Sequence, residues 1–271
     1  MTPSTHFTAG NTPDAPRSDV PGLLGSLATD LQGIGYTVDG VAGLLGPAAH
    51  SALARDQLVP ALIVTEAAVR AETPTAALAA VVRLWLLAEP QPAATLDAAL
   101  PGVRTQGLLE LGLVEPAPEG RVRAKVDLRP YGWEETHGEN AVGSGGAELW
   151  VASDLAAHQR PGVLRHDHVL GIGQASSTLV QVTARRHVAR ALDLGTGCGI
   201  QTFHLLHHAE HVTATDISER ALAFTRFNLL LNAGQLHLDP SNLDARDSLR
   251  LASPLDPVAG AEFQLAASNP P

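Results

Sequence analysis

The sequence is poor in cysteine, aromatic residues and basic residues, and each shortage excludes something. The single cysteine, Cys198, cannot form an intramolecular disulfide, and this fits a reducing cytoplasm. Aromatic residues make up 4% of the 271 residues, so Ala, Leu and Val must fill most of the core. The net charge of −10 weighs against tight, nonspecific binding of nucleic acid. It leaves open a local basic groove, such as one around Arg185, Arg186 and Arg190.

Long apolar runs and a secretory signal are also missing. The most apolar stretch, VVRLWLLAEP, is interrupted by Arg83 and closed by Glu89-Pro90, so no membrane-spanning helix and no membrane partner are expected. The N-terminus is polar and rich in proline, without the charged start and apolar stretch of a signal peptide. We expect residues 1–22 to be a disordered tail.

Residues 23–136 are predicted to form a mostly helical N-terminal domain. The stretches AAHSALARDQLVPALIV and TPTAALAAVVRLWLLAEP have apolar residues at spacings of three and four. Residues 95–131 then indicate a helix, a turn, a second helix and an alternating segment over Val122–Leu128. That order is similar to a winged helix, but the simpler interpretation, a small helical domain with one strand, is favoured. Its acidity points to a protein surface rather than DNA as the partner.

A second, α/β domain is predicted over residues 149–271. It follows a Gly- and Ser-rich stretch, residues 137–148, that is typical of a linker. Strand and helix patterns then alternate: LWVASDLA, GQASSTLVQVTARR, RALDLGTG, GIQTFHLLHHA, HVTATDIS, ERALAFTRFNLLLNAG and EFQLAASNPP. Such alternation indicates a parallel sheet with helices on its faces.

A glycine turn follows the third of these patterns. The stretch LDLGTGCGIQ places an acidic residue and three glycines at every second position: Asp193, Gly195, Gly197 and Gly199. Glycines let the backbone turn sharply and approach a ligand closely, and the helix that follows adds unpaired N–H groups. The dinucleotide fingerprint would need glycine at Ile200, and the phosphate-binding P-loop would need a lysine. The spacing therefore disfavours both.

An acidic residue ends the next strand pattern. Asp216 can accept two hydrogen bonds from ribose hydroxyls, and Ile217 could pack on an adenine face. The alternative role for Asp216 is to cap the following helix. Ser218 can do that instead, because the helical pattern begins at Glu219. Ribose binding is therefore favoured.

With these residues, positions 148–271 resemble the class I S-adenosylmethionine-dependent methyltransferases. The resemblance implies a Rossmann-like fold and S-adenosylmethionine as cofactor. It also implies that the turn, with Asp193, Gly195, Thr196, Gly197 and Gly199, holds the methionine end of the cofactor. In the same way, Asp216 holds the ribose, and Ile217 lies against the adenine. An acidic residue near the adenine has two candidate counterparts here, Asp247 and Ser253.

The sequence ends in LAASNPP, a stiff segment rich in hydrogen-bond acceptors. Pro270 and Pro271 have no N–H, and the residue before each proline is held extended. The Asn269 side-chain oxygen and the carbonyls of Asn269 and Pro270 could bind both hydrogens of a planar –NH2 group. Fixing those hydrogens turns the nitrogen lone pair toward a methyl donor and stabilises the developing positive charge. This chemistry requires no metal.

Asn-Pro-Pro followed by an aromatic residue resembles the signature of methyltransferases that act on such nitrogens. The groups with this signature include the release-factor glutamine methyltransferases (the HemK group) and the methyltransferase small domain enzymes of ribosomal RNA guanine. This sequence departs from their pattern at Gln264, where an acidic residue is usual, and it has no aromatic residue after Pro271. We therefore expect a C-terminally truncated, incomplete sheet and a chain of 271 residues that methylates poorly.

Two groups of histidines are given a structural interpretation. His204, His207, His208 and His211 have spacings that could bind zinc, but a solvated helix face is favoured because no carboxylate or thiol completes a site. The histidines of RHDH, residues 165–168, are expected to lie at the polar entry to VLGIG, a stretch beside the cofactor in the resembled enzymes.

Three functions remain in competition. An N-methyltransferase is favoured, with a protein glutamine, as in a release factor, ahead of an exocyclic amine of ribosomal RNA or DNA. A non-catalytic binding module with a cofactor-type fold is the second. A nicotinamide-dependent oxidoreductase is disfavoured by Ile200 and by Asn-Pro-Pro.

Overall fold

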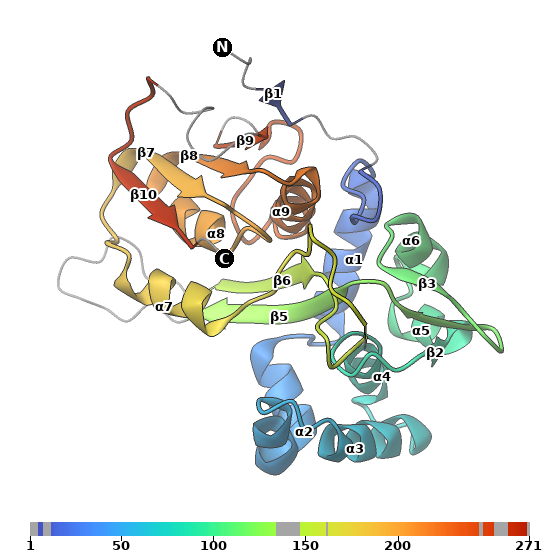
Figure 1. Ribbon diagram of the computed structural model, residues 1–271. Coiled ribbons are helices and arrows are strands. Elements are labelled where there is room, and N and C mark those ends of the chain that lie inside the picture. The colour runs from blue at the N-terminus through green and yellow to red at the C-terminus, as the bar shows by residue number, and fades with distance from the viewer. Residues whose placement is uncertain are drawn as a thin grey trace. The chain divides into compact units, whose positions relative to one another are not determined.

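The computed structural model describes residues 5–7, 12–133, 147–160, 162–243, 246–251 and 260–269. These residues form two compact units, and each unit takes segments from separate parts of the chain (Figure 1). The helical unit comprises residues 20–132 and 148–165. The sheet unit comprises residues 1–19, 133–147 and 166–271, with the gaps given above.

The helical unit follows the order predicted from the sequence but contains more strands. Its elements are α1 (Pro21–Gly33), α2 (Val38–Leu53), α3 (Val59–Arg70), α4 (Ala76–Trp85), β2 (Gln91–Pro92), α5 (Ala93–Ala99), α6 (Arg104–Glu110), β3 (Val114–Ala117), β4 (Arg121–Ala124), β5 (Asp127–Trp133) and β6 (Ala147–Ser153). Strands β2, β4 and β3 pair in that order as an antiparallel sheet. Three strands pair here, so the favoured expectation of a single strand is wrong. The succession α4-β2-α5-α6-β3-β4 is similar to that of a winged helix.

The core of the helical unit explains why its boundary differs from the predicted one. Tyr36 and Trp85 are fully buried, with ring centroids 6.0 Å apart. The Trp150 indole donates a hydrogen bond to the Tyr36 carbonyl at 2.7 Å, and Gln159 donates one to the Trp85 carbonyl at 2.8 Å. Residues 148–165 therefore complete the helical unit, although the sequence pattern assigned them to the α/β domain. The predicted linker, residues 137–148, lies almost entirely outside the described residues.

The sheet unit has the predicted α/β architecture. Its elements are β1 (Thr5–His6), α7 (Gln174–Val182), β7 (Val188–Leu194), α8 (Ile200–Leu206), β8 (Ala209–Asp216), α9 (Glu219–Leu231), β9 (Asp247–Leu251) and β10 (Leu265–Ser268). Strands β9, β8, β7 and β10 pair in parallel, in that order, and β1 pairs antiparallel with β9. The parallel order, with β8 and β7 inside the sheet and a helix following each of them, is the predicted Rossmann-like arrangement.

Apolar residues concentrate where two helices cover the central strands. Phe203 on α8 and Phe224 and Phe227 on α9 are fully buried. Burying each such ring stabilises the fold by about 1.5–3 kcal/mol. Helix α9 is capped by Ser218, whose hydroxyl accepts a hydrogen bond from the Ala221 N–H, as the sequence predicts. The cap places the start of α9 directly after the last residue of β8, at the carboxyl edge of the sheet.

The N-terminal segment is not a free tail in its described parts. Thr5 and His6 pair with Leu251 and Arg250. Ala15 and Pro16 are buried, and α1 begins at Pro21. The prediction of a disordered tail over residues 1–22 is therefore wrong for these positions. An exposed strand edge offers unpaired N–H and C=O groups, which a polar segment can pair as well as an apolar one. The strand β9 was not predicted either.

Candidate functional site

The glycine turn follows β7, and no side chains of the described residues cover one face of this turn. Gly195, Gly197 and Gly199 have φ angles of +77°, +58° and +94°, which L side chains rarely adopt. Within the described part of the chain, a Cβ added to Gly195 or Gly197 would meet no atom within 4 Å. A Cβ on Gly199 would lie 3.2 Å from the Thr225 side chain. The first two glycines therefore border space that a ligand can enter, and the third allows α9 to pack closely.

The Asp216 carboxylate ties the tip of β8 to this turn. One oxygen accepts a hydrogen bond from the Gly197 N–H at 3.0 Å, and the other accepts one from the Ser218 N–H at 2.9 Å. Asp216 is half-buried, whereas Ile217 beside it is 73% exposed. Each carboxylate oxygen has two lone pairs, so both oxygens keep capacity for ribose hydroxyls. The helix cap falls to Ser218, as predicted.

Asp193 lies beneath the turn rather than on its open face. The residue is completely buried, and one carboxylate oxygen accepts a hydrogen bond from the Thr202 hydroxyl at 2.7 Å. Burial raises the pKa of Asp193 to about 6, against the lowering effect of the threonine hydrogen bonds. Its other oxygen is buried and has no hydrogen-bond partner among the described residues. A buried acceptor without a partner is unusual and carries a desolvation cost.

Side chains of α9 hold the turn from below, and the sequence reasoning missed them. The Thr225 hydroxyl donates to the Gly197 carbonyl at 2.9 Å, and the Asn228 amide donates to the Cys198 carbonyl at 2.8 Å. The Thr196 hydroxyl lies 3.1 Å from the Thr202 hydroxyl, so it belongs to this buried network and not to the open face. The detectable signal was two uncharged polar residues, three positions apart, among the apolar residues of this helix.

The parallel register brings the end of β10 to the same place. Ser268 pairs with Leu194, so Asn269 stands at the level of Gly195 on the neighbouring strand. The Ser268 hydroxyl donates to the Leu194 carbonyl at 2.9 Å. The Asn269 amide nitrogen donates to the Ser176 hydroxyl of α7 at 3.0 Å. Pro270 and Pro271 lie outside the described residues.

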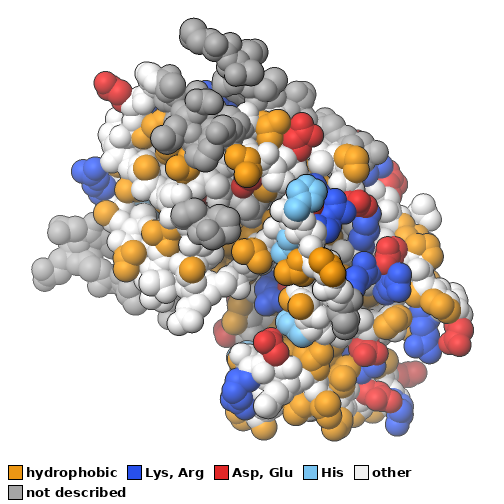
Figure 2. Space-filling view, viewed as in Figure 1, with side chains coloured by type: hydrophobic (Ala, Val, Ile, Leu, Met, Phe, Trp, Pro, Cys, Tyr) orange, Lys and Arg blue, Asp and Glu red, His pale blue; other side chains and the backbone are white. Residues whose placement is uncertain are grey.

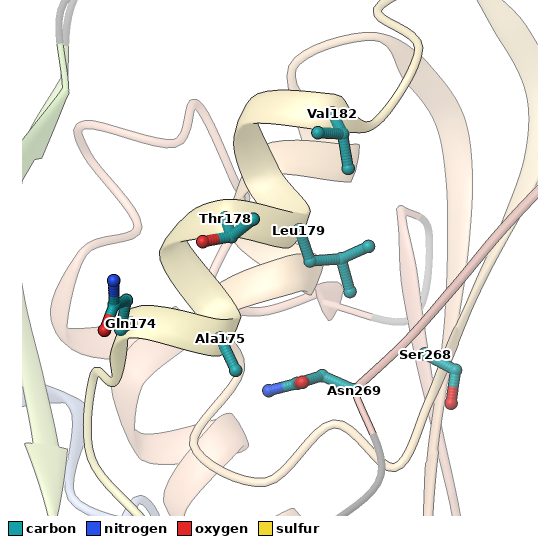
Figure 3. A pocket seen from close by; sticks show the side chains of 7 residues that line it. All are labelled: Gln174, Ala175, Thr178, Leu179, Val182, Ser268 and Asn269. Atoms are coloured by element: carbon teal, nitrogen blue, oxygen red, sulfur yellow. The ribbon is translucent and has the colours of Figure 1, made fainter.

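A hollow of about 550 Å³ opens between α7 and the end of β10 (Figure 3). It is lined by apolar and uncharged polar residues: Gln174, Ala175, Thr178, Leu179, Val182, Ser268 and Asn269. Figure 3 shows the Asn269 side chain directed toward α7, with the apolar side chains of that helix along the same hollow. A neutral group with a short apolar stem fits such a lining.

Of the two candidates for the adenine contact, Asp247 is wrong. It pairs with Val212, whereas Leu251 pairs with Asp216. Four residues of strand therefore separate it from the carboxyl edge, about 13 Å at the usual rise per residue. Asp247 is also completely buried. Ser253, the other candidate, lies outside the described residues.

The histidine cluster is only in part the solvated helix face that the sequence favoured, because His207 is exposed but His204 is not. His204 is buried, with its ring centroid 4.0 Å from that of Trp133, and the His207 ring meets the same indole edge-on at 5.0 Å. Burial lowers the pKa of His204 to about 3, helped by the charges of Arg185 and the neighbouring histidines. His211 lies in β8, beyond the helix, as predicted. Among the described residues, no group of three or more His, Cys, Asp or Glu could hold a metal ion.

Gln264, where the resembled enzymes usually have an acidic residue, has a structural role. Its side-chain oxygen accepts a hydrogen bond from the Arg190 N–H at 2.8 Å, and its own N–H donates to the Arg190 carbonyl at 3.0 Å. The Arg190 guanidinium lies 5.0 Å from the centre of the Phe263 ring, and Arg186 donates to the Gln264 carbonyl. These contacts attach the start of β10 to β7.

Comparison with known proteins agrees with this geometry. Residues 154–271 match the family model described as Methyltransferase small domain, and residues 33–125 match that described as Domain of unknown function (DUF7059). No curated protein matches the sequence. A crystal structure of wild-type Trm5b from Pyrococcus abyssi is similar at 12% identity and a TM-score of 0.27, over 48% of this chain and 37% of that chain. That likeness is too distant to carry an argument. The match of residues 154–271 supports a class I, S-adenosylmethionine-dependent methyltransferase domain.

The residues at the carboxyl edge fit this cofactor. The uncovered glycines and the half-buried Asp216, with the exposed Ile217 beside it, offer surfaces for its methionine, ribose and adenine parts, whereas Asp193 is buried beneath the turn. No helix in the described parts of the chain is long and apolar enough to cross a membrane.

Proposed function

We propose that this chain carries an S-adenosylmethionine-dependent N-methyltransferase whose acceptor is a planar –NH2 group, the side-chain amide of a protein glutamine. One observation carries the proposal. The register of β7 and β10 brings Asn269 to the level of Gly195, at the same edge of the sheet where β8 ends with Asp216. The segments that follow three parallel strands thus begin at the same edge of the sheet. In open α/β sheets, ligands bind at this carboxyl edge.

The cofactor side is assigned to the turn and to β8. Gly195 and Gly197 admit the methionine part without steric hindrance, and Asp216 accepts from the ribose hydroxyls. Ile217 offers an apolar face to the adenine. When bound, S-adenosylmethionine supplies a methyl group on a positively charged sulfonium.

The acceptor side is assigned to Asn269 with the two prolines after it. The Asn269 amide nitrogen is occupied by the Ser176 hydroxyl, so its oxygen is left to face the other way. That oxygen, with backbone carbonyls of the Asn-Pro-Pro segment, can accept both hydrogens of an –NH2 group. Holding those hydrogens keeps the nitrogen lone pair directed at the methyl donor and stabilises positive charge on nitrogen.

The choice of a protein glutamine rests on the lining of the hollow and on charge. The hollow beside Asn269 is uncharged, and Ala175, Leu179 and Val182 suit the two methylene groups of a glutamine. Figure 2 shows basic and acidic side chains interspersed on the visible face of the helical unit. The exposed arginines of strand β4 pair with carboxylates, Arg121 with Glu119 and Arg123 with Glu115. A polyanion would find few unpaired cations there, which favours a protein such as a release factor, in the cytoplasm.

The test combines calorimetry with labelled methyl transfer. The chain is titrated with S-adenosylmethionine and then incubated with labelled cofactor and either a release factor or ribosomal RNA. We expect binding, and slow transfer to the release factor with weak dependence on salt. Label on RNA that falls steeply with salt would reassign the acceptor to an exocyclic amine. Binding without transfer to either would support a non-catalytic module, and no binding would overturn the proposal.

A further inference from the structure

A buried arginine joins two distant segments beside the ribose carboxylate. Arg220 is the second residue of α9, four positions after Asp216, and it is 5% exposed. Its Nε and Nη2 both donate to the Asp14 carbonyl, at 3.1 and 2.9 Å. Its Nη1 donates to the Asp167 carbonyl at 3.0 Å, and the Asp167 carboxylate lies 3.9 Å away. A desolvated guanidinium is stable only when several partners surround it in this way.

The segment around Asp14, which Arg220 holds, has a defined backbone conformation. Residues 12–16, here called the N-terminal strap, turn back on themselves where the Ala15 N–H donates to the Thr12 carbonyl at 3.3 Å. Asp14 has a φ of +57°, a conformation that costs free energy for a residue other than glycine. Ala15 and Pro16 are then buried against the sheet unit. A strained residue followed by buried ones indicates a segment anchored in place.

The position of Arg220 near Asp216 shows which part of the cofactor site the strap lies beside. The first turn of α9 sits at the carboxyl edge, directly after the residue assigned to the ribose, so the segments that Arg220 holds lie beside that end of the cofactor site. We infer that the N-terminal strap and residues 166–169, clamped by Arg220, form a wall of the ribose and adenine end. Arg220 is a positioning residue, because it holds this wall and not the cofactor. The inference rests on the proposed function.

Hydrogen–deuterium exchange and calorimetry on the full chain test it together. In the unchanged protein, S-adenosylmethionine should slow exchange in the strap and in residues 166–169. Arg220→Lys keeps the charge but loses the planar fork, so exchange there should rise and the dissociation constant for the cofactor should increase about tenfold. Arg226→Lys, on the same helix, is the matched control and should change neither quantity.

Each outcome decides the matter. Deletion of residues 1–16 removes the strap and leaves Arg220, and it takes the place of Arg220→Lys should that variant fail to fold. A deleted protein that binds the cofactor as tightly as the full chain overturns the inference, as does a strap whose exchange ignores the cofactor. If the unchanged protein binds no cofactor, the proposed function fails instead, and increased strap exchange in Arg220→Lys would still establish the clamp.

Discussion

At the scale of single residues, the site depends on a few polar groups in unusual surroundings. The half-buried Asp216 has both carboxylate oxygens engaged by backbone N–H groups, and the buried Asp193 has one oxygen satisfied and one orphaned. The first arrangement fixes a carboxylate in an orientation where it can accept further bonds. The second leaves a buried acceptor unsatisfied, which costs free energy in the folded state.

Replacing Asp216 by Asn should weaken cofactor binding. The amide has one acceptor oxygen where the carboxylate has two, and bonds to a charged acceptor contribute more than neutral ones. We expect the dissociation constant for S-adenosylmethionine to rise about 10- to 100-fold, measured by calorimetry. Asp239→Asn, in an exposed turn, is the control and should leave the constant unchanged. Equal affinities in the two variants would contradict the assignment of Asp216.

Asp193 should make stability depend on pH. Its pKa is about 6 in the folded chain against an ordinary value of 3.8, so the folded state binds the extra proton between those values. The free energy of unfolding should therefore fall as pH rises from about 4 to 6, by something on the order of 3 kcal/mol. Asp193→Asn should remove this part of the dependence. Urea unfolding of both proteins across that range is the measurement, and parallel pH profiles would refute the prediction.

At the scale of elements, two helices position the loops at the carboxyl edge. Helix α9 supports the glycine turn through Thr225 and Asn228, and α7 contacts Asn269 through Ser176. The loops at this edge include the glycine turn, whose glycines have no side chains to pack. Their geometry is therefore expected to follow the helices.

Thr225→Val should loosen the turn, because it keeps the shape of the side chain and loses the hydroxyl that bonds the Gly197 carbonyl. We expect the dissociation constant for the cofactor to rise several-fold and the free energy of unfolding to fall by about 1–2 kcal/mol. Thr225→Ser retains the hydroxyl and should preserve most of the affinity. Calorimetry that ranks the serine variant with the valine variant would count against this support.

Ser176→Ala should slow methyl transfer without affecting cofactor affinity. The change frees the Asn269 amide to rotate, so its oxygen faces the acceptor for a smaller fraction of the time. We expect the initial rate at saturating cofactor to fall about tenfold. Ser177→Ala is the matched control, since that hydroxyl bonds the Gly173 carbonyl of its own helix. A rate for Ser176→Ala equal to that of the control would remove Ser176 from the site.

At the scale of the whole molecule, the chain is divided differently from the linear order of its patterns. Residues 148–165 return to the helical unit, and residues 1–19 belong to the sheet unit. The chain therefore passes between its two units more than once. Residues that are far apart in sequence, such as Tyr36 and Trp150, share one core.

This division predicts how fragments behave. A fragment of residues 20–165 should unfold cooperatively, because it contains β6 and the Trp150 and Gln159 hydrogen bonds. A fragment of residues 20–147 loses those partners and leaves the Tyr36 and Trp85 carbonyls unpaired. We expect its melting temperature to be lower by 10 °C or more, or its transition to be lost. Thermal unfolding followed by circular dichroism compares the two, and equal transitions would contradict the boundary.

The sequence by itself determined the α/β class of the sheet unit and the positions of the glycine turn, Asp216 and Ser218. These features depend on local rules: periodicity, positive φ at glycine, and helix capping, all of which act within a few residues.

Only the tertiary structure decided which distant segments meet. The Asp14 contact with Arg220, the burial of His204 under Trp133, the place of Trp150 in the helical unit and the distance of Asp247 from the carboxyl edge all involve residues separated by many positions. Such contacts depend on strand register and on which surfaces of one segment remain exposed for another segment to pack against. Neither is encoded in the local pattern of any one segment.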